Sequence, residues 1–173
     1  MNDKLIIYQI LTRLFTNGNK YCVPNGTIEQ NGCGKMNDIT SHVLESIRSL
    51  GSTHVWYTGI IEHATKTDYS RFGIRPDNPY IVKGRAGSPY AIKDYYDIDP
   101  DLAVSVPDRM KEFEALVDRT HKAGLKVIID FVPNHVARQY HSDAAPAGVK
   151  DFSADDDTRS EERRVGKECP TEC

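Results

Sequence analysis

Three apolar segments separated by two amphipathic ones constrain the fold of this chain more than any other feature. Short runs of Ile, Val, Leu and Tyr predict buried strands, whereas apolar residues three and four positions apart predict helices. We expect strands at residues 5–10, 53–58 and 125–132 and helices at residues 36–50 and 107–123. Because strands that alternate with helices are typical of a parallel sheet with helical crossovers, the sequence predicts an α/β fold.

The order of these elements fits both a closed (β/α)8 barrel and an open doubly wound sheet. In both folds, ligands bind at the carboxyl ends of the strands. The segments that follow the expected strands are residues 12–35, 59–96 and 130–135. Residues 59–96 show neither a helical nor a strand period, and loops of that length are usually functional. We therefore expect the functional residues in these three segments.

The composition argues against two classes of partner. The chain carries a net charge of −3 without a basic excess, so neither nucleic acid nor an anionic membrane surface is an expected partner. No apolar run approaches the ~20 residues of a membrane span, and the first residues lack the pattern of a secretory leader. A cytoplasmic protein is the expectation, with a periplasmic or secreted one left open if the chain lacks its true start.

The four cysteines show no zinc-binding spacing. Cys22 and Cys33 lie in one Gly- and Asn-rich stretch, whereas Cys169 and Cys173 lie near the C-terminus. Free thiols are the expected state of Cys22 and Cys33 in a cytosolic chain, and pairing between these two stays open.

Polar residues near two other strand ends are weaker candidates. Glu62 and His63 follow the second expected strand and could line the mouth of a site there, but we interpret them as ordinary loop residues. The acidic segment Asp97–Asp101 is similar to the start of a calcium-binding loop, but Leu102 stands where such a loop needs glycine. We interpret this segment as a surface turn.

The clearest polar motif follows the third expected strand, where Asp130 precedes Asn134 and His135. Polar side chains directly after an apolar strand lie where a ligand binds in such folds. A capped strand end with a solvated histidine explains the same residues equally well. Taken alone, the motif leaves both interpretations open.

This motif resembles the first of the short sequence regions of the α-amylase family, in which the third barrel strand ends in D-x-x-x-N-H. A second match is Tyr90 followed four residues later by Asp94 and then by two tyrosines. A third is the first strand, which leads to Phe15 and then to a helix that opens near Asp38. The three matches occur in the family's order and cover roughly residues 4–157.

The resemblance implies that residues 1–157 are the N-terminal part of a (β/α)8 catalytic domain. They would form the first three strands and two helices of a TIM barrel, with a long loop after the second strand. The family's activity is that of a retaining glycoside hydrolase or transglycosidase acting on α-glucosidic bonds through a covalent intermediate. Starch, maltooligosaccharides, trehalose and sucrose all stay open as substrates.

The resemblance also implies roles for individual residues. Tyr90 would stack under a sugar ring, His135 would bind a hydroxyl of the same sugar, and Asp94 would be a further substrate-binding residue. Asp130 would be a buried structural acid paired with an arginine from a later strand. Asn134 would be a ligand in those members that bind calcium, and Ca²⁺ is the only cofactor that the resemblance implies.

The family's catalytic acids follow the fourth, fifth and seventh strands, and no acid of this chain matches them. A complete barrel needs roughly 250 residues. We therefore assign no catalytic residue and expect this chain to be inactive by itself. Residues 158–173 are expected to be a non-native or disordered tail, because the run from Arg159 closely resembles a translated sequencing adapter.

Two alternatives stay open beside this hypothesis. The first is a non-catalytic sugar-binding module that keeps only the binding residues. The second is a TIM-barrel enzyme of other chemistry, such as a phosphate-binding isomerase. One departure from the family also affects the substrate, because many members have Gly-Tyr-Asp where this chain has Pro89-Tyr90-Ala91.

Overall fold

The computed structural model describes residues 4–151, which form two compact units. The first, here called the sheet unit, contains the described residues up to Ile60 together with residues 98–130. The second, here called the loop unit, contains residues 61–97 together with the described residues from Phe131 onward. The expected tail at residues 158–173, with Cys169 and Cys173, lies outside the described residues.

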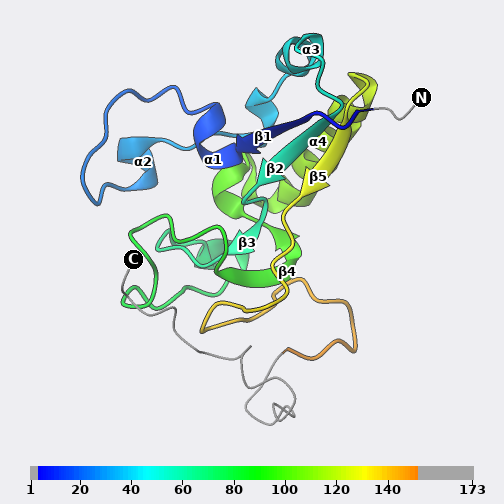
Figure 1. Cartoon of the computed structure of the whole chain (residues 1–173). Helices are drawn as coiled ribbons and strands as arrows, with labels where there is room; N and C mark the ends of the chain where they lie inside the picture. Colours follow the sequence, from blue (N-terminus) through cyan, green and yellow to red (C-terminus); the bar gives the residue numbers. More distant parts are fainter. Residues whose placement is uncertain (1–3, 152–173) are drawn as a thin grey trace. The chain divides into compact units, whose positions relative to one another are not determined.

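The sheet unit is built on a three-stranded parallel sheet in which β2 (His54–Thr58) lies between β1 (Ile7–Leu11) and β5 (Lys126–Ile129) (Figure 1). Trp56 pairs with Gln9 on one side and with Ile128 on the other. All three expected strands are therefore confirmed, and the sheet is parallel as predicted.

The last of these strands is shorter than the sequence predicts. It ends at Ile129, whereas apolar character continues to Val132. The carbonyl of Val132 accepts a hydrogen bond from the hydroxyl of Tyr95, so this backbone group is bound by a side chain outside the parallel ladder. Apolar character alone cannot show which partner a backbone carbonyl will find.

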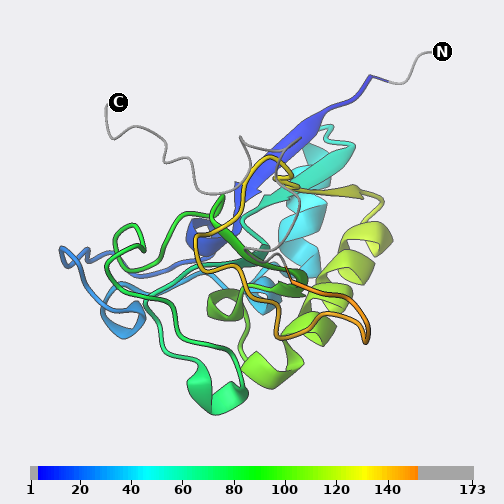
Figure 2. The ribbon, with the colours of Figure 1, turned by 90° about the horizontal axis from the view of Figure 1, so that it is seen from below.

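Two helices accompany the sheet, α3 (Ser41–Ser49) and α4 (Arg109–Lys122), and they lie side by side (Figure 2). The expected helix at residues 36–50 is divided, because Thr40 caps α3 and the 3₁₀ helix η1 (Met36–Asp38) precedes it. A second 3₁₀ helix, η4 (Val106–Asp108), leads into α4.

Shorter elements complete the sheet unit. The Gly- and Asn-rich stretch contains α1 (Thr12–Phe15) and α2 (Ile28–Asn31), and the 3₁₀ helix η3 (Pro100–Leu102) precedes η4. No helix of the described residues has the length and apolar content that a membrane crossing needs.

The core of the sheet unit consists of aliphatic side chains and one tyrosine. Leu44 of α3, Leu116 of α4 and Val55 of β2 are fully buried. The hydroxyl of Tyr57 lies 2.7 Å from the hydroxyl of Thr120, so the one polar group of this tyrosine is satisfied within the core. Burial of these side chains stabilises the unit by about 2 kcal/mol each.

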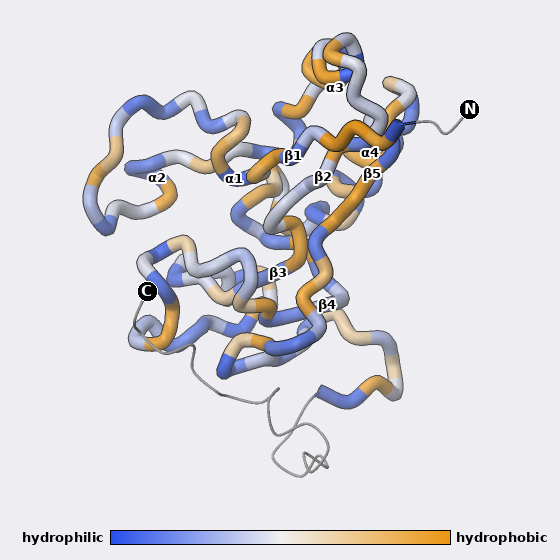
Figure 3. The backbone as a smooth tube through the Cα atoms, in the orientation of Figure 1, coloured by the Kyte–Doolittle hydropathy of each residue, from blue (hydrophilic) through white to orange (hydrophobic). Residues whose placement is uncertain are grey.

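The two outer strands of the sheet still expose apolar side chains. Ile7 and Leu11 of β1 and Ile129 of β5 are about two-fifths to one-half exposed. In Figure 3 most of the backbone of both strands has the colour of hydrophobic residues. Within the described residues, β1 and β5 each pair only with β2.

The expected surface turn at Asp97–Asp101 is wrong, because its acids are buried. Asp99 and Asp101 are both fully buried, and the guanidinium of Arg13 forms ion pairs with them. Burial alone would lower the pKa of Arg13, but the two carboxylates outweigh this effect and raise it. A buried acid needs such a partner, and Arg13 is distant in sequence.

The loop unit contains a second, two-stranded sheet of β3 (Ile61–His63) and β4 (Ile92–Ile98). The expectation that residues 59–96 are one long loop is therefore only partly correct, since both ends of that segment are strands. The backbone N–H of Ala64 donates to Ala91 beyond the end of β3. Between the strands the chain forms turns and one short 3₁₀ helix, η2 (Ser70–Phe72).

Candidate functional site

Strand β4 holds the segment that carries the Asn-His motif. The carbonyl of Ile92 accepts a hydrogen bond from the N–H of Ala137 at 2.7 Å, and the carbonyl of Lys93 accepts one from His141 at 3.1 Å. The next two residues of β4, Asp94 and Tyr95, bind the same segment with their side chains. Consecutive residues of one strand thus fix the backbone that follows Phe131.

Asp94 is a buried anchor for this segment, with only 1% of its surface exposed. Its Oδ1 accepts hydrogen bonds from the N–H of Tyr96 and the hydroxyl of Ser142, at 2.8 and 2.7 Å. Its Oδ2 accepts from the N–H groups of Asp143 and Ala144, at 2.9 and 3.2 Å. A sugar hydroxyl could contact Asp94 only by displacing one of these donors, so its role as a substrate-binding residue stays a prediction.

His135 and Asn134 lie together on the surface of the loop unit. The ring Nδ1 of His135 is 3.0 Å from Oδ1 of Asn134, and both residues are exposed. Because an amide oxygen only accepts hydrogen bonds, Nδ1 is the donor in this contact, and Nε2 is the ring nitrogen that stays available for a further hydrogen bond. His135 can therefore form a hydrogen bond with a sugar hydroxyl through Nε2.

The surroundings of Asn134 do not make a calcium site by themselves. Calcium needs several oxygen ligands, with carboxylates prominent among them. The side-chain oxygen of Asn134 already lies against the ring of His135. Among residues 4–151, one group of side chains has metal-binding spacing, and it consists of Glu62, Asp94 and Asp97. None of these residues is adjacent to Asn134 in the sequence.

Tyr90 precedes β4 by two residues, and its side chain is 49% exposed. The turn before it is packed closely against the chain after β3. A Cβ on Gly87, whose φ is +77°, would lie 1.7 Å from the carbonyl oxygen of Ala64, so only glycine fits there. His63 strengthens the same contact through Nε2, 3.1 Å from the carbonyl of Ala86. The ring of Tyr90 is thus presented by a tightly held turn.

Asp130 lies at the end of β5, in the sheet unit. Its Oδ1 accepts a hydrogen bond from the indole N–H of Trp56, and its Oδ2 is buried without a partner in the described part of the chain. A buried carboxylate oxygen without a donor is costly. The resemblance places the arginine partner of Asp130 on a later strand, so this pairing stays a prediction.

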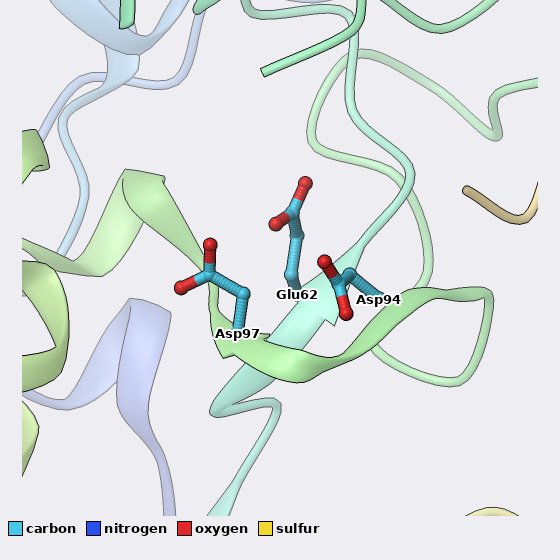
Figure 4. Close-up of side chains that lie close together, drawn as sticks. All are labelled: Glu62, Asp94 and Asp97. Atoms are coloured by element: carbon cyan, nitrogen blue, oxygen red, sulfur yellow. The ribbon is translucent and has the colours of Figure 1, made fainter. Parts of the chain in front are cut away.

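The sequence analysis missed a buried charged cluster in the loop unit. Glu62 and His63 are 2% and 3% exposed, so their interpretation as ordinary loop residues is wrong. Oxygens of Glu62, Asp94 and Asp97 lie within 4.8 Å of one another, on the neighbouring strands β3 and β4 (Figure 4). A sequence signal for this cluster exists, since three charged residues, Lys93, Asp94 and Asp97, lie in a short segment bounded by Ile92 and Ile98.

Lys93 supplies positive charge to this cluster. Its ammonium lies 3.6 Å from Oε1 of Glu62 and 3.5 Å from Oδ2 of Asp77, and it donates to the carbonyl of Arg75. All three charged side chains are nearly completely buried. Lys93 therefore joins β3, β4 and the intervening turns.

The two cysteines within the described residues are free thiols, as expected. Cys22 is exposed and Cys33 is partly buried. Burial raises the pKa of the Cys33 thiol to about 11, even though Arg13 opposes this shift. The thiol is therefore neutral at pH 7, and a neutral thiol is a poor nucleophile.

Comparison with known proteins places this arrangement in a family. Residues 9–172 match the family model for the α-amylase catalytic domain. Maltase 1 of Drosophila virilis is 28% identical over 151 residues, which are 85% of this chain and 18% of that protein. An amino acid transporter heavy chain of Mus musculus is 30% identical over 134 residues, which are 78% of this chain and 14% of that protein.

A solved structure supports the same assignment. The crystal structure of an α-amylase from Lactobacillus plantarum matches with a TM-score of 0.52 and 28% identity, over 78% of this chain and 24% of that chain. The chain thus spans less than a fifth of the length of the two curated relatives. The chain belongs to the α-amylase family, and its parallel sheet with flanking helices is part of that family's (β/α)8 barrel.

Proposed function

We propose that this chain is part of a glycoside hydrolase or transglycosidase that acts on α-glucosidic bonds, and that its loop unit binds a glucosyl residue of the substrate. Family membership supports the reaction class. The binding role rests on His135. Its ring contacts Asn134 through Nδ1, which leaves Nε2 for a ligand, and its backbone carbonyl lies 3.2 Å from the hydroxyl of Tyr95 on β4. Tyr90 offers an exposed aromatic face two residues before the same strand begins.

The chemistry of these two side chains suits a sugar. An aromatic ring packs against the apolar C–H face of a pyranose while its edge stays solvated. The imidazole nitrogen receives or donates a hydrogen bond to a hydroxyl group.

Three buried acids of the described chain, Asp94, Asp101 and Glu112, are engaged in structural contacts. Three of the four hydrogen bonds to Asp94 hold the segment after β5, and Asp101 pairs with Arg13. The carboxylate of Glu112 accepts hydrogen bonds from the N–H groups of Val104 and Ser105. A retaining mechanism needs a free nucleophile and a separate acid/base, so we propose that hydrolysis requires acids beyond this chain.

Titration of the 173-residue chain with maltooligosaccharides, followed by NMR, tests the binding role. We expect weak saturable binding, because two side chains provide little contact area. Tyr90→Ala and His135→Ala should each weaken binding about fivefold, as expected for the loss of one favourable contact. Tyr80→Ala is the matched control, since Tyr80 is 95% exposed in the same unit and has no proposed role.

Absence of saturable binding, or an equal effect of Tyr80→Ala, would contradict the proposal. Turnover of a maltooligosaccharide by this chain would contradict the part that places the catalytic acids elsewhere. A calcium titration monitored at the side-chain amide of Asn134 tests that residue as a ligand, and a shift confined to other residues would exclude it.

A non-catalytic sugar-binding protein is the second candidate. It is favoured by the engagement of buried acids in structural contacts. The source DNA beyond the codon for Asp157 separates the candidates. A stop codon there favours the binding protein, whereas acids at the ends of a fourth and a fifth strand favour the enzyme.

A further inference from the structure

Tyr95 makes contacts that the proposed binding role of His135 does not yet use. Its hydroxyl donates to the carbonyl of Val132 and lies 3.2 Å from the carbonyl of His135. The two carbonyls belong to the first and last residues of the turn that contains Asn134. The one hydroxyl proton of Tyr95 is thus shared between the carbonyls at the two ends of the turn.

Aromatic contacts hold the ring of Tyr95 in place. Its centroid is 5.7 Å from that of Phe131 and 5.8 Å from that of Tyr140, with both pairs tilted. These distances are typical of favourable aromatic pairs. Phe131 and Tyr140 lie on either side of the turn in sequence, so the ring is held by the same segment that its hydroxyl binds.

The backbone of His135 is therefore restrained on both sides. On one side is the hydroxyl of Tyr95, and on the other is the hydrogen bond from the N–H of Ala137 to the carbonyl of Ile92. The contact between Asn134 and the ring Nδ1 of His135 then sets the direction of the imidazole. Since β5 ends at Ile129, the hydrogen bonds that hold this turn within residues 4–151 run to β4.

We propose that Tyr95 is a positioning residue, which fixes the turn at residues 132–135 so that Nε2 of His135 meets the sugar hydroxyl. Tyr95 does not touch the sugar in this proposal, and it acts only through the two carbonyls. The inference deepens the proposed function and rests on it for the identity of the ligand. Pre-organisation of this kind strengthens binding by reducing the ordering that binding requires.

The substitution Tyr95→Phe removes the hydroxyl and keeps the ring that packs between Phe131 and Tyr140. Tyr96→Phe is the matched control, since the same atom is deleted at the next position of β4, where the side chain is 42% exposed. The experiment uses the 173-residue chain with a maltooligosaccharide as the probe. Amide hydrogen exchange of residues 133–137, the NMR signals of the His135 ring and the dissociation constant are measured for each variant.

We expect Tyr95→Phe to accelerate exchange at residues 133–137 and to weaken sugar binding, each about fivefold, as expected for the loss of one hydrogen bond. The His135 ring signals should shift toward values for a freely rotating side chain. Tyr96→Phe should leave all three readouts unchanged. Removal of the imidazole should abolish the effect, so that His135→Ala and the double variant with Tyr95→Phe bind equally weakly.

Each of the other outcomes contradicts either the positioning role of Tyr95 or the proposed function. If the original chain binds sugar and Tyr95→Phe binds equally well, the positioning role is wrong while the proposed function stands. If exchange accelerates without a change in affinity, Tyr95 is only a structural residue and the inference is wrong. If the original chain binds no sugar, the proposed function is wrong, and the positioning role for a sugar ligand is wrong with it.

Discussion

The sheet unit and the loop unit are stabilised by different kinds of interaction. The core of the sheet unit is a continuous set of apolar side chains from β1, β2, α3 and α4, with Leu44 and Leu116 fully buried. The apolar cluster of the loop unit consists of Ala64, Val82 and Ala137. In place of a larger core, the loop unit buries charged groups and pairs them.

This difference shows how a segment with few helices and strands can still hold binding side chains in fixed positions. Apolar contacts are nondirectional and tolerate small shifts, whereas hydrogen bonds to a buried carboxylate specify both distance and direction. Asp94 and Tyr95 specify the path of the segment after β5 in this way. We expect the loop unit to be more sensitive than the sheet unit to the loss of a single polar group.

The largest expected effect tests this sensitivity at Lys93. Lys93→Met keeps most of the side-chain volume but leaves the carboxylates of Glu62 and Asp77 without the ammonium. Removing one partner of a buried ion pair costs about 4 kcal/mol. Hydrogen exchange should show this loss of protection in β4 while the amides of β2 keep theirs.

Lys83→Met is the control for that experiment, because Lys83 is an exposed lysine of the same unit. Its effect should stay below about 0.5 kcal/mol. Equal protection of β4 in the Lys93 variant and the original chain would show that the buried charges do not stabilise the loop unit.

A core substitution gives the corresponding test for the sheet unit. Leu116→Ala creates a cavity beneath α4, and such cavities cost about 3 kcal/mol. The loss should appear in the amides of β2 and α4 and spare those of β4. Leu50→Ala, at a position that is 70% exposed, should change protection by less than about 0.5 kcal/mol. If β4 loses as much protection as β2, the two units unfold together and the comparison fails.

The smallest expected effect concerns alkaline pH. Burial raises the pKa of Tyr57 to about 12 from the ordinary tyrosine value of 10.0. As the pH rises above 10, the unfolded chain loses this proton before the folded chain does, so the sheet unit becomes less stable. The contribution of Tyr57 should fall by about 2 kcal/mol by pH ~12.

Urea unfolding of Tyr57→Phe and of the original chain, at about pH 9 and about pH 12, measures this contribution. The variant should lose less stability between the two conditions, although it also lacks the contact with Thr120. An identical decrease in both proteins would mean that Tyr57 does not titrate in this interval.

The sequence by itself determined the parallel sheet and its two helices, because both depend on local periodicity. The spacing of Val43, Leu44 and Ile47 indicates a helix in any context, and Gly51 ends it with the positive φ that a helix end favours. The candidate residues Tyr90, Asn134 and His135 could also be found, because short motifs keep their spacing. Their roles in sugar binding stay predictions.

Only the tertiary structure decided which acids are buried and what they bind. Nothing near Asp94 in the sequence indicates Ser142 and Asp143 as its donors, and nothing near Asp99 indicates Arg13. Tyr95 likewise finds its two carbonyl acceptors across about 40 residues. The periodicity of apolar residues indicates which face of one helix or strand is buried. The partner of a polar group depends instead on which distant segments the fold brings together.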